Sequence, residues 1–191
     1  VRFGILHSNI CFPNDGRQVS TNLCLYQVVY GDGSFTEGEF GLDSLTFQGA
    51  SIRNVALGCG NDNEGLFTGA AGLFGLGAGS LSFISQLTTT PSRYPKIFSY
   101  CLLDRDAVGL STLTFGGFPH PSGGQFAFTS LLVNQDYPTF YYVPLTGISV
   151  GGVLLTSIPM SAFHMDTIPG PNNGGGVIID SGTSVSRLTN D

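Results

Sequence analysis

The chain has 191 residues and a formal net charge of −6, because seven lysines and arginines stand against 13 aspartates and glutamates. So few basic residues exclude the positive footprint that nucleic-acid binding needs, and they disfavour an anionic membrane surface. The uncharged stretch Ala70–Leu87 contains too much glycine and serine for a membrane span. The chain starts at Val1 without a signal peptide, so we expect a processed or truncated soluble piece.

The composition predicts an all-β or mostly β fold. Glycine occurs 28 times, aromatic residues make up 12% of the chain and charged residues only 10%. Apolar, β-branched and aromatic residues come in short runs that glycine, proline, asparagine and aspartate interrupt, which is typical of strands and turns. The length predicts one domain, or one domain and a piece of another.

The first predicted element is a long β-hairpin. Its arms are Leu23–Tyr30 and Phe35–Phe47, and the turn residues Gly31–Ser34 form its tip. Ile52–Leu57 is predicted to be a further strand, and the polar residues Asn61–Gly65 a loop.

A short helix is predicted over Ser80–Leu87. Ser80 is its expected N-cap, and Leu81, Ile84 and Leu87 lie on one face. Proline- and glycine-rich loops follow at His120–Gln125, which we interpret as a hinge, and at Ile168–Gly176. The remaining predicted strands are Ile97–Leu103, Leu110–Phe115, Phe126–Val133, Phe140–Val150, Val153–Leu155 and the buried strand Val177–Ile179.

The four cysteines are Cys11, Cys24, Cys59 and Cys101. No C-x-x-C pair occurs, so a zinc site is not expected. An even number in a β-rich chain of low charge favours disulfides and a secretory compartment. Three pairings are open, of which we favour Cys11–Cys24 with Cys59–Cys101, and the alternative is four buried free thiols.

The strongest chemical signal is an aspartate that follows the apolar strand Val177–Ile179. The strand places Asp180 at the start of a tight loop, where glycine allows close backbone approach and hydroxyl groups can donate to the carboxylate. Without the preceding strand and the hydroxyls, Asp-Ser-Gly would be an ordinary turn. The loop residues are Ser181, Gly182, Thr183 and Ser184.

The second signal is the hairpin tip. Tyr30 ends a strand beside Gly31, Asp32, Gly33 and Ser34, and such a tip can bend over a cleft and cover a peptide. The alternative is an ordinary β-turn with an exposed tyrosine.

The motifs resemble those of the pepsin-like aspartic peptidases, and they occur along the chain in the order of that family. Asp180–Ser184 is similar to the second active-site loop of that family, and Tyr30–Ser34 to its flap, with Tyr30 at the flap tyrosine. Ala71–Gly77 resembles the segment that supports the first active-site loop. The resemblance to the plant nucellin-like and nepenthesin-like subgroup rests on Val55–Gly65, Phe98–Leu102, Phe115–Gly117 and Phe140–Gly152.

The resemblance implies a fold of two β lobes, each of which supplies one aspartate to a cleft between them. The two carboxylates share a proton; one activates a water as base and the other polarises the scissile carbonyl. Asp180 is then a catalytic residue of an endopeptidase, the flap contacts a peptide or protein substrate, and neither a metal nor an organic cofactor is expected.

The chain departs from this pattern because no Asp-Thr-Gly or second Asp-Ser-Gly precedes the flap. Asp15 lacks the hydroxyl residue before Gly16 and follows no apolar strand, so we reject it as the partner carboxylate. We therefore expect an incomplete fold: an N-terminal lobe over 1–136 without its aspartate loop and the start of a C-terminal lobe over 137–191, with the boundary within 118–137. Such a chain should be inactive alone and should need a complementary segment or self-association.

Two other functions stay open. The chain could be a non-catalytic homologue that binds another protein, such as a glycan-degrading enzyme, or a fragment without autonomous function. We expect a secreted, apoplastic or vacuolar protein, and a chloroplast destination is the alternative.

Overall fold

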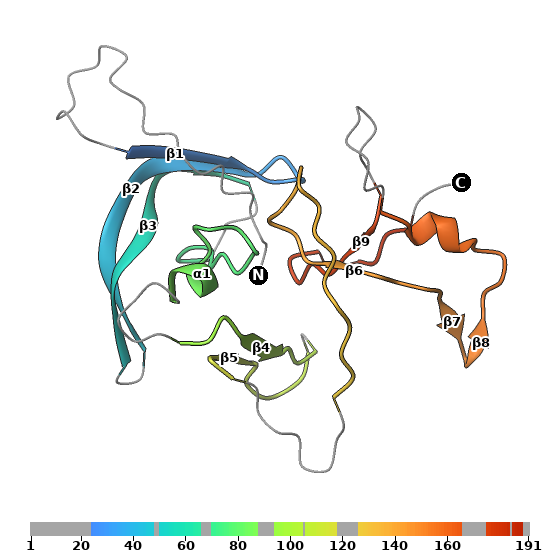
Figure 1. Cartoon of the computed structure of the whole chain (residues 1–191). Helices are drawn as coiled ribbons and strands as arrows, with labels where there is room; N and C mark the ends of the chain where they lie inside the picture. The colour runs from blue at the N-terminus through green and yellow to red at the C-terminus, as the bar shows by residue number, and fades with distance from the viewer. Residues whose placement is uncertain are drawn as a thin grey trace. The chain divides into compact units, whose positions relative to one another are not determined.

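The computed structural model describes residues 24–47, 50–65, 70–87, 94–104, 106–117, 126–165, 175–183 and 185–188. These residues are mostly β-structure with very little helix, as the composition predicts and as the resemblance to an all-β pepsin-like fold implies. The chain divides into two compact units between Gly124 and Gln125, and each is described by itself (Figure 1). No described helix combines the length and apolar composition that crossing a bilayer requires. The assignment of 1–136 and 137–191 to two lobes stays a prediction.

The first unit is built on a three-stranded antiparallel sheet in the order β1-β2-β3, which Figure 1 shows as a strongly curved ribbon. Its strands are β1 (Cys24–Val29), β2 (Phe35–Phe47) and β3 (Ala50–Glu64). The predicted long hairpin is confirmed by the pairing of β1 with β2. Alternate side chains of β1 point to opposite faces, so Val28 is buried while Val29 is exposed.

The predicted polar loop at Asn61–Gly65 is wrong, because β3 continues through Glu64. Asp62 and Asn63 pair with Glu37 and Thr36 of β2, and this long-range pairing overrides the turn preference of asparagine and aspartate. A register shift next to Gly38 lets β3 keep its pairing on both sides of the irregularity.

The short helix is present as α1 (Phe83–Leu87), but the predicted N-cap is wrong. The hydroxyl of Ser82, not Ser80, accepts the backbone N–H of Ser85 at 3.4 Å. Ser82 is buried, whereas Ser80 is exposed and lies before the first helical turn.

The core of this unit lies between β3, α1 and a small second sheet, which pairs β4 (Phe98–Cys101) with β5 (Thr112–Phe115). The rings of Phe83 and Phe74 have centroids 4.6 Å apart, and those of Phe83 and Phe115 are 5.1 Å apart in an edge-to-face arrangement. The largest side chains that are fully buried are Leu76, Ile84, Leu87 and Val55.

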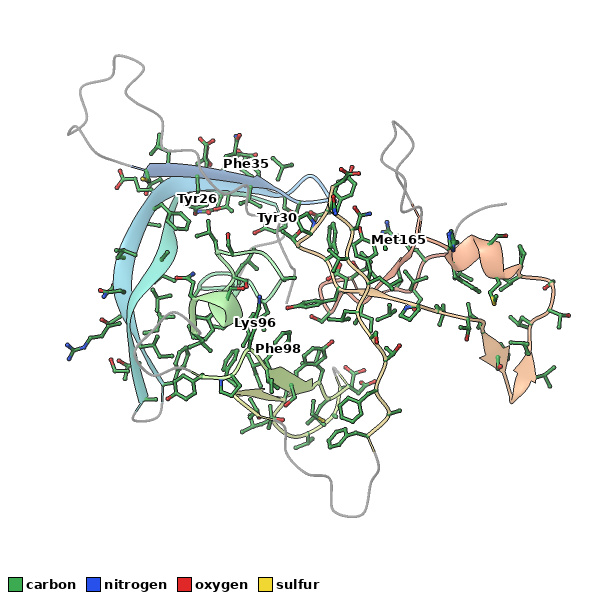
Figure 2. All side chains as sticks on the ribbon, viewed as in Figure 1. Tyr26, Tyr30, Phe35, Lys96, Phe98 and Met165 are labelled. Atoms are coloured by element: carbon green, nitrogen blue, oxygen red, sulfur yellow. The ribbon has the colours of Figure 1, made fainter. Side chains whose placement is uncertain are left out.

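The second unit consists of short pieces. Strand β6 (Tyr142–Val143) pairs with β9 (Val177–Ile178), and β7 (Ser149–Val150) pairs with β8 (Val153–Leu154). A 3₁₀ helix, η1 (Met160–Phe163), precedes the buried Met165, which is labelled in Figure 2.

Two predicted strands of this unit are wrong in extent. Phe140–Val150 divides into β6 and β7, because Pro144 lacks the N–H that a continuous ladder would use. Phe126–Val133 forms no named strand, and only Leu132 bridges to Tyr142.

The cysteines confirm only part of the predicted disulfide framework. Cys24 is disulfide-bonded, whereas Cys11 lies outside the described residues. The predicted Cys59–Cys101 bond is wrong for this structure, since both are free, exposed thiols. Cys59 pairs with β2 in one sheet and Cys101 with β5 in another, so the two strands are not neighbours.

Candidate active site

Asp180 lies directly after β9, in a loop that its own carboxylate organises. One carboxylate oxygen, Oδ1, accepts the backbone N–H of Gly182 at 2.8 Å, and Oδ2 accepts the hydroxyl of Thr183 at 2.5 Å. The backbone N–H of Thr183 also donates to the Asp180 carbonyl at 3.3 Å. These donors hold the carboxylate in one orientation.

The strand that delivers Asp180 is less buried than predicted. Ile178 is 39% and Ile179 is 54% exposed, so the expectation of a buried strand is wrong for the described structure. The reason is that β9 pairs with β6 over only two residue pairs. Asp180 itself is half-buried.

Strand β6 supports the aspartate loop from one side. The N–H of Ile179 donates to the carbonyl of Tyr141 at 3.0 Å, which extends the β6–β9 pairing up to the residue before Asp180. Burial raises the pKa of Tyr141 above its ordinary value of 10.0, so its hydroxyl is neutral wherever a carboxylate would be titrated. The ring of Tyr142 contacts Phe140 edge-to-face, with centroids 6.3 Å apart.

The predicted flap residues form one closed tip at the end of the β1–β2 hairpin. Gly33 donates to the Tyr30 carbonyl at 2.9 Å, and Tyr30 donates to the Ser34 carbonyl at 2.8 Å. Gly33 has a φ of +83°, a left-handed conformation that favours glycine and is typical of three-residue hairpin loops.

Asp32 caps this tip with its side chain. Its Oδ1 accepts the Ser34 N–H at 3.2 Å, and its Oδ2 accepts the Ser34 hydroxyl at 2.8 Å. Ser34 is buried beside Gly65, where a Cβ would lie 2.3 Å from the Ser34 hydroxyl oxygen. Tyr30 is half-buried and lies at the end of β1 (Figure 2).

The structure therefore groups the predicted site residues in two places. Asp180, Ser181, Gly182 and Thr183 share one loop of the second unit, and Tyr30–Ser34 share the hairpin tip of the first. Ser184 lies outside the described residues. Among the described residues, no group of three or more His, Cys, Asp and Glu side chains could hold a metal ion.

Sequence reasoning missed a polar chain behind the hairpin tip. The Tyr26 hydroxyl, the Thr36 hydroxyl and the Asn63 side chain form consecutive hydrogen bonds across β1, β2 and β3. These residues are 10 and 27 positions apart in the sequence, so only the register of the sheet brings them together.

Comparison with known proteins finds matches to a family model and to curated plant proteins. Residues 6–117 match the family model described as xylanase inhibitor N-terminal. Aspartyl protease family protein 2 of Arabidopsis thaliana is 54% identical over 86% of this chain and 32% of its own length. The protein named ASPARTIC PROTEASE IN GUARD CELL 2, also from A. thaliana, is 40% identical over 95% of the chain and 36% of its own length.

Aspartic proteinase nepenthesin-1 of Nepenthes gracilis is 40% identical over 96% of the chain and 40% of its own length. The chain thus spans about a third to two fifths of the length of these curated relatives. No solved structure matches the chain. With its hairpin, its aspartate loop and these matches, the chain belongs to the pepsin-like aspartic protease family, among plant relatives that include nepenthesin.

Proposed function

We propose that the protein is an aspartic endopeptidase in which Asp180 is one of two catalytic carboxylates and Tyr30–Ser34 is the flap. The observation that carries the proposal is the Asp180 loop, in which a backbone N–H and a hydroxyl hold the carboxylate at 2.8 and 2.5 Å. Relatives that cover most of the chain are named aspartic proteases, which supports the same reaction and a peptide or protein substrate.

The proposed chemistry needs a second carboxylate. Two carboxylates about 3 Å apart share one proton, so the ionised one can take a proton from water while the other polarises the peptide carbonyl. Asp180 is the only aspartate of these 191 residues that stands in an Asp-Ser-Gly or Asp-Thr-Gly motif. We therefore propose that the second carboxylate is supplied by residues outside these 191 or by a second copy, and that the isolated chain does not cleave peptides.

The neighbours of Asp180 have defined parts in this scheme. The Gly182 N–H and the Thr183 hydroxyl keep the carboxylate oriented through the reaction. The closed hairpin tip would cover the bound peptide and exclude bulk solvent other than the reacting water. The disulfide at Cys24 supports a route through an oxidising compartment, so we propose a secreted or vacuolar protein.

The test is cleavage of an internally quenched peptide at acid pH by the protein at the full length of its relatives, with and without pepstatin. We expect cleavage that pepstatin blocks and that Asp180→Asn abolishes. Cleavage that survives Asp180→Asn would refute the role of Asp180. Pepstatin-sensitive cleavage by the 191-residue chain alone would assign the second carboxylate to a second copy if, in mixtures with Asp180→Asn at constant total concentration, it falls with the square of the wild-type fraction.

One observation favours a second candidate function. The family model that matches residues 6–117 is described by xylanase inhibition, so a non-catalytic protein that binds a glycan-degrading enzyme is the competing proposal. The ordered Asp180 loop argues against it, since binding alone does not require an oriented carboxylate. A titration of the protein against a xylanase, with residual xylanase activity as the signal, separates the two: inhibition without peptide cleavage would favour the binding protein.

A further inference from the structure

The candidate is the polar chain behind the hairpin tip, defined as Tyr26, Thr36 and Asn63. The Tyr26 and Thr36 hydroxyl oxygens are 3.0 Å apart, and the Thr36 hydroxyl donates to Asn63 Oδ1 at 2.6 Å. The Asn63 amide nitrogen then donates to the Gly60 carbonyl at 3.1 Å, which fixes the orientation of the amide.

The direction of every bond in the chain follows from proton counting. The Thr36 hydroxyl has one proton, and that proton goes to Asn63, so Tyr26 must donate to Thr36. The order of donation is Tyr26 to Thr36 to Asn63 to the Gly60 carbonyl, and Thr36 is the only member that both accepts from β1 and donates to β3. Removal of the Thr36 hydroxyl would therefore break both links at once.

The chain joins two strands that do not pair with each other. β1 and β3 flank β2 on opposite sides, so their backbones share no ladder, and β1 pairs only with β2 among the described strands. Within the described sheet, β1 has a hydrogen-bonded neighbour on one side only. The side-chain bonds across all three strands therefore add a second connection between β1 and the rest of the sheet.

Glycines make the space for this chain. A Cβ at Gly58 would lie 2.5 Å from the Tyr26 ring, and a Cβ at Gly60 would lie 2.4 Å from Asn63 Oδ1. Tyr26 also meets the Phe40 ring edge-to-face, with centroids 6.1 Å apart. The three polar side chains therefore have a defined position on one face of the sheet.

The position of the chain connects it to the tip. Thr36 faces Val28 across β1 and β2, one residue pair behind the Val29–Phe35 pair that adjoins the tip. Thr36 and Asn63 are directly opposite each other across β2 and β3. Figure 2 shows Tyr26 and Tyr30 on the strand that enters the tip.

We propose that Thr36 is a positioning residue, whose two hydrogen bonds orient the hairpin tip and, through it, Tyr30. The effect on catalysis rests on the proposed endopeptidase function, whereas the effect on the tip does not. Thr36→Val removes the hydroxyl at nearly constant volume, and Thr36→Ser keeps it. Thr46→Val is the matched control, because Thr46 is an exposed threonine near the other end of the same strand, opposite Ser51.

The first readout is amide hydrogen exchange in the whole protein. Thr36→Val should speed exchange of the Tyr30 and Gly33 amides by roughly twofold to a hundredfold, the range expected for loss of one to two net hydrogen bonds. Exchange in α1 and in β4–β5 should stay unchanged, and Thr36→Ser should restore the tip. Equal acceleration of all amides, or a tip no faster than in Thr46→Val, would overturn the proposal.

The second readout separates this proposal from the proposed function. With a cleaved peptide, Thr36→Val should raise KM several-fold and leave kcat within about twofold, because the tip contacts substrate without touching the reacting atoms. A protein that cleaves no peptide refutes the endopeptidase, and the exchange result still decides the role of Thr36. If Thr36→Val does not fold, Tyr26→Phe, which removes only the first donor, decides the matter by the same exchange measurement.

Discussion

The hairpin tip and the aspartate loop share one local hydrogen-bond pattern in different surroundings. In each, one carboxylate oxygen accepts a backbone N–H two residues later, and the other accepts a hydroxyl. The tip carboxylate, Asp32, is exposed on a turn between two strands, whereas Asp180 is half-buried after a short one. A carboxylate-capped turn is therefore not itself a catalytic signature, and the scaffold around it decides its use.

The two scaffolds also differ in how firmly they hold their turns. The tip connects strands of six and 13 residues, and a third strand of 15 residues pairs with the second. The aspartate loop follows a strand of two residues that pairs with a second strand of two. The position of the tip depends on many backbone hydrogen bonds, whereas the position of Asp180 depends on few. The Asp180 loop should therefore respond more strongly than the tip to the loss of one side-chain hydrogen bond.

The largest expected difference is in kcat, between Asp180→Asn and Asp32→Asn. Both substitutions keep an acceptor for the turn and remove one charge. Asp180→Asn should lower kcat of the full-length protein about a thousandfold, because it removes the group that we propose transfers protons. Asp32→Asn should leave kcat within a few-fold. Steady-state kinetics at acid pH check both, and an equal loss in the two variants would contradict the assignment of roles.

The next difference concerns the hydroxyl in each turn. Thr183→Val removes the 2.5 Å bond to Asp180 and should lower kcat/KM roughly tenfold, since it releases one oxygen of the proposed catalytic carboxylate. Ser34→Ala removes the matching 2.8 Å bond to Asp32 and should act on tip exchange more than on turnover. Thr183→Ser should recover most of the loss, and failure to recover it would show that the methyl group matters instead.

A third prediction concerns the support of the hairpin unit. The side-chain amide of Gln86 pairs with the backbone of β3: it accepts the Ala56 N–H at 2.7 Å and donates to the Ala56 carbonyl at 3.2 Å. Gln86→Leu leaves both backbone groups half-buried without this partner and should lower the free energy of unfolding by about 1–2 kcal/mol. Gln86→Glu keeps only the acceptor. Its free energy of unfolding should lie between those of the unsubstituted protein and Gln86→Leu. Chemical denaturation of the three proteins measures the order.

The smallest expected effect comes from a repulsion between two carboxylates on neighbouring strands of the hairpin sheet. Glu37 and Asp62 are directly opposite each other on β2 and β3, and like charges in that position repel. Glu37→Gln should raise Tm by about 1–3 °C at pH 7, and it keeps an acceptor for Gln27.

Salt tests the cause, because dissolved ions screen the repulsion between exposed charges. The gain should therefore shrink at about 1 M salt, where the screening length is about 3 Å. Asp43→Asn is the control, since Asp43 lies on the same strand opposite the neutral Val55. A gain of equal size at low and high salt would refute the repulsion.

Local sequence determined the turns and the strands of strong pattern. Gly33 must provide a left-handed residue at the tip, so the hairpin and its turn are predictable from Tyr30–Ser34 together with the apolar arms. The Asp180 loop is predictable for the same reason, because Gly182 and Thr183 are the donors nearest in sequence to the carboxylate. Both candidate sites, and the family to which they belong, were therefore accessible from short motifs.

Only the tertiary structure decided the features that depend on register and on distant partners. Asn61–Glu64 has the composition of a loop, yet pairing with β2 makes it a strand, and Ser82 rather than Ser80 caps α1. The links from Tyr26 through Thr36 to Asn63 and from Gln86 to Ala56 join residues 10, 27 and 30 positions apart. No local pattern predicts such contacts, because a side chain's partner across a sheet is set by the alignment of whole strands.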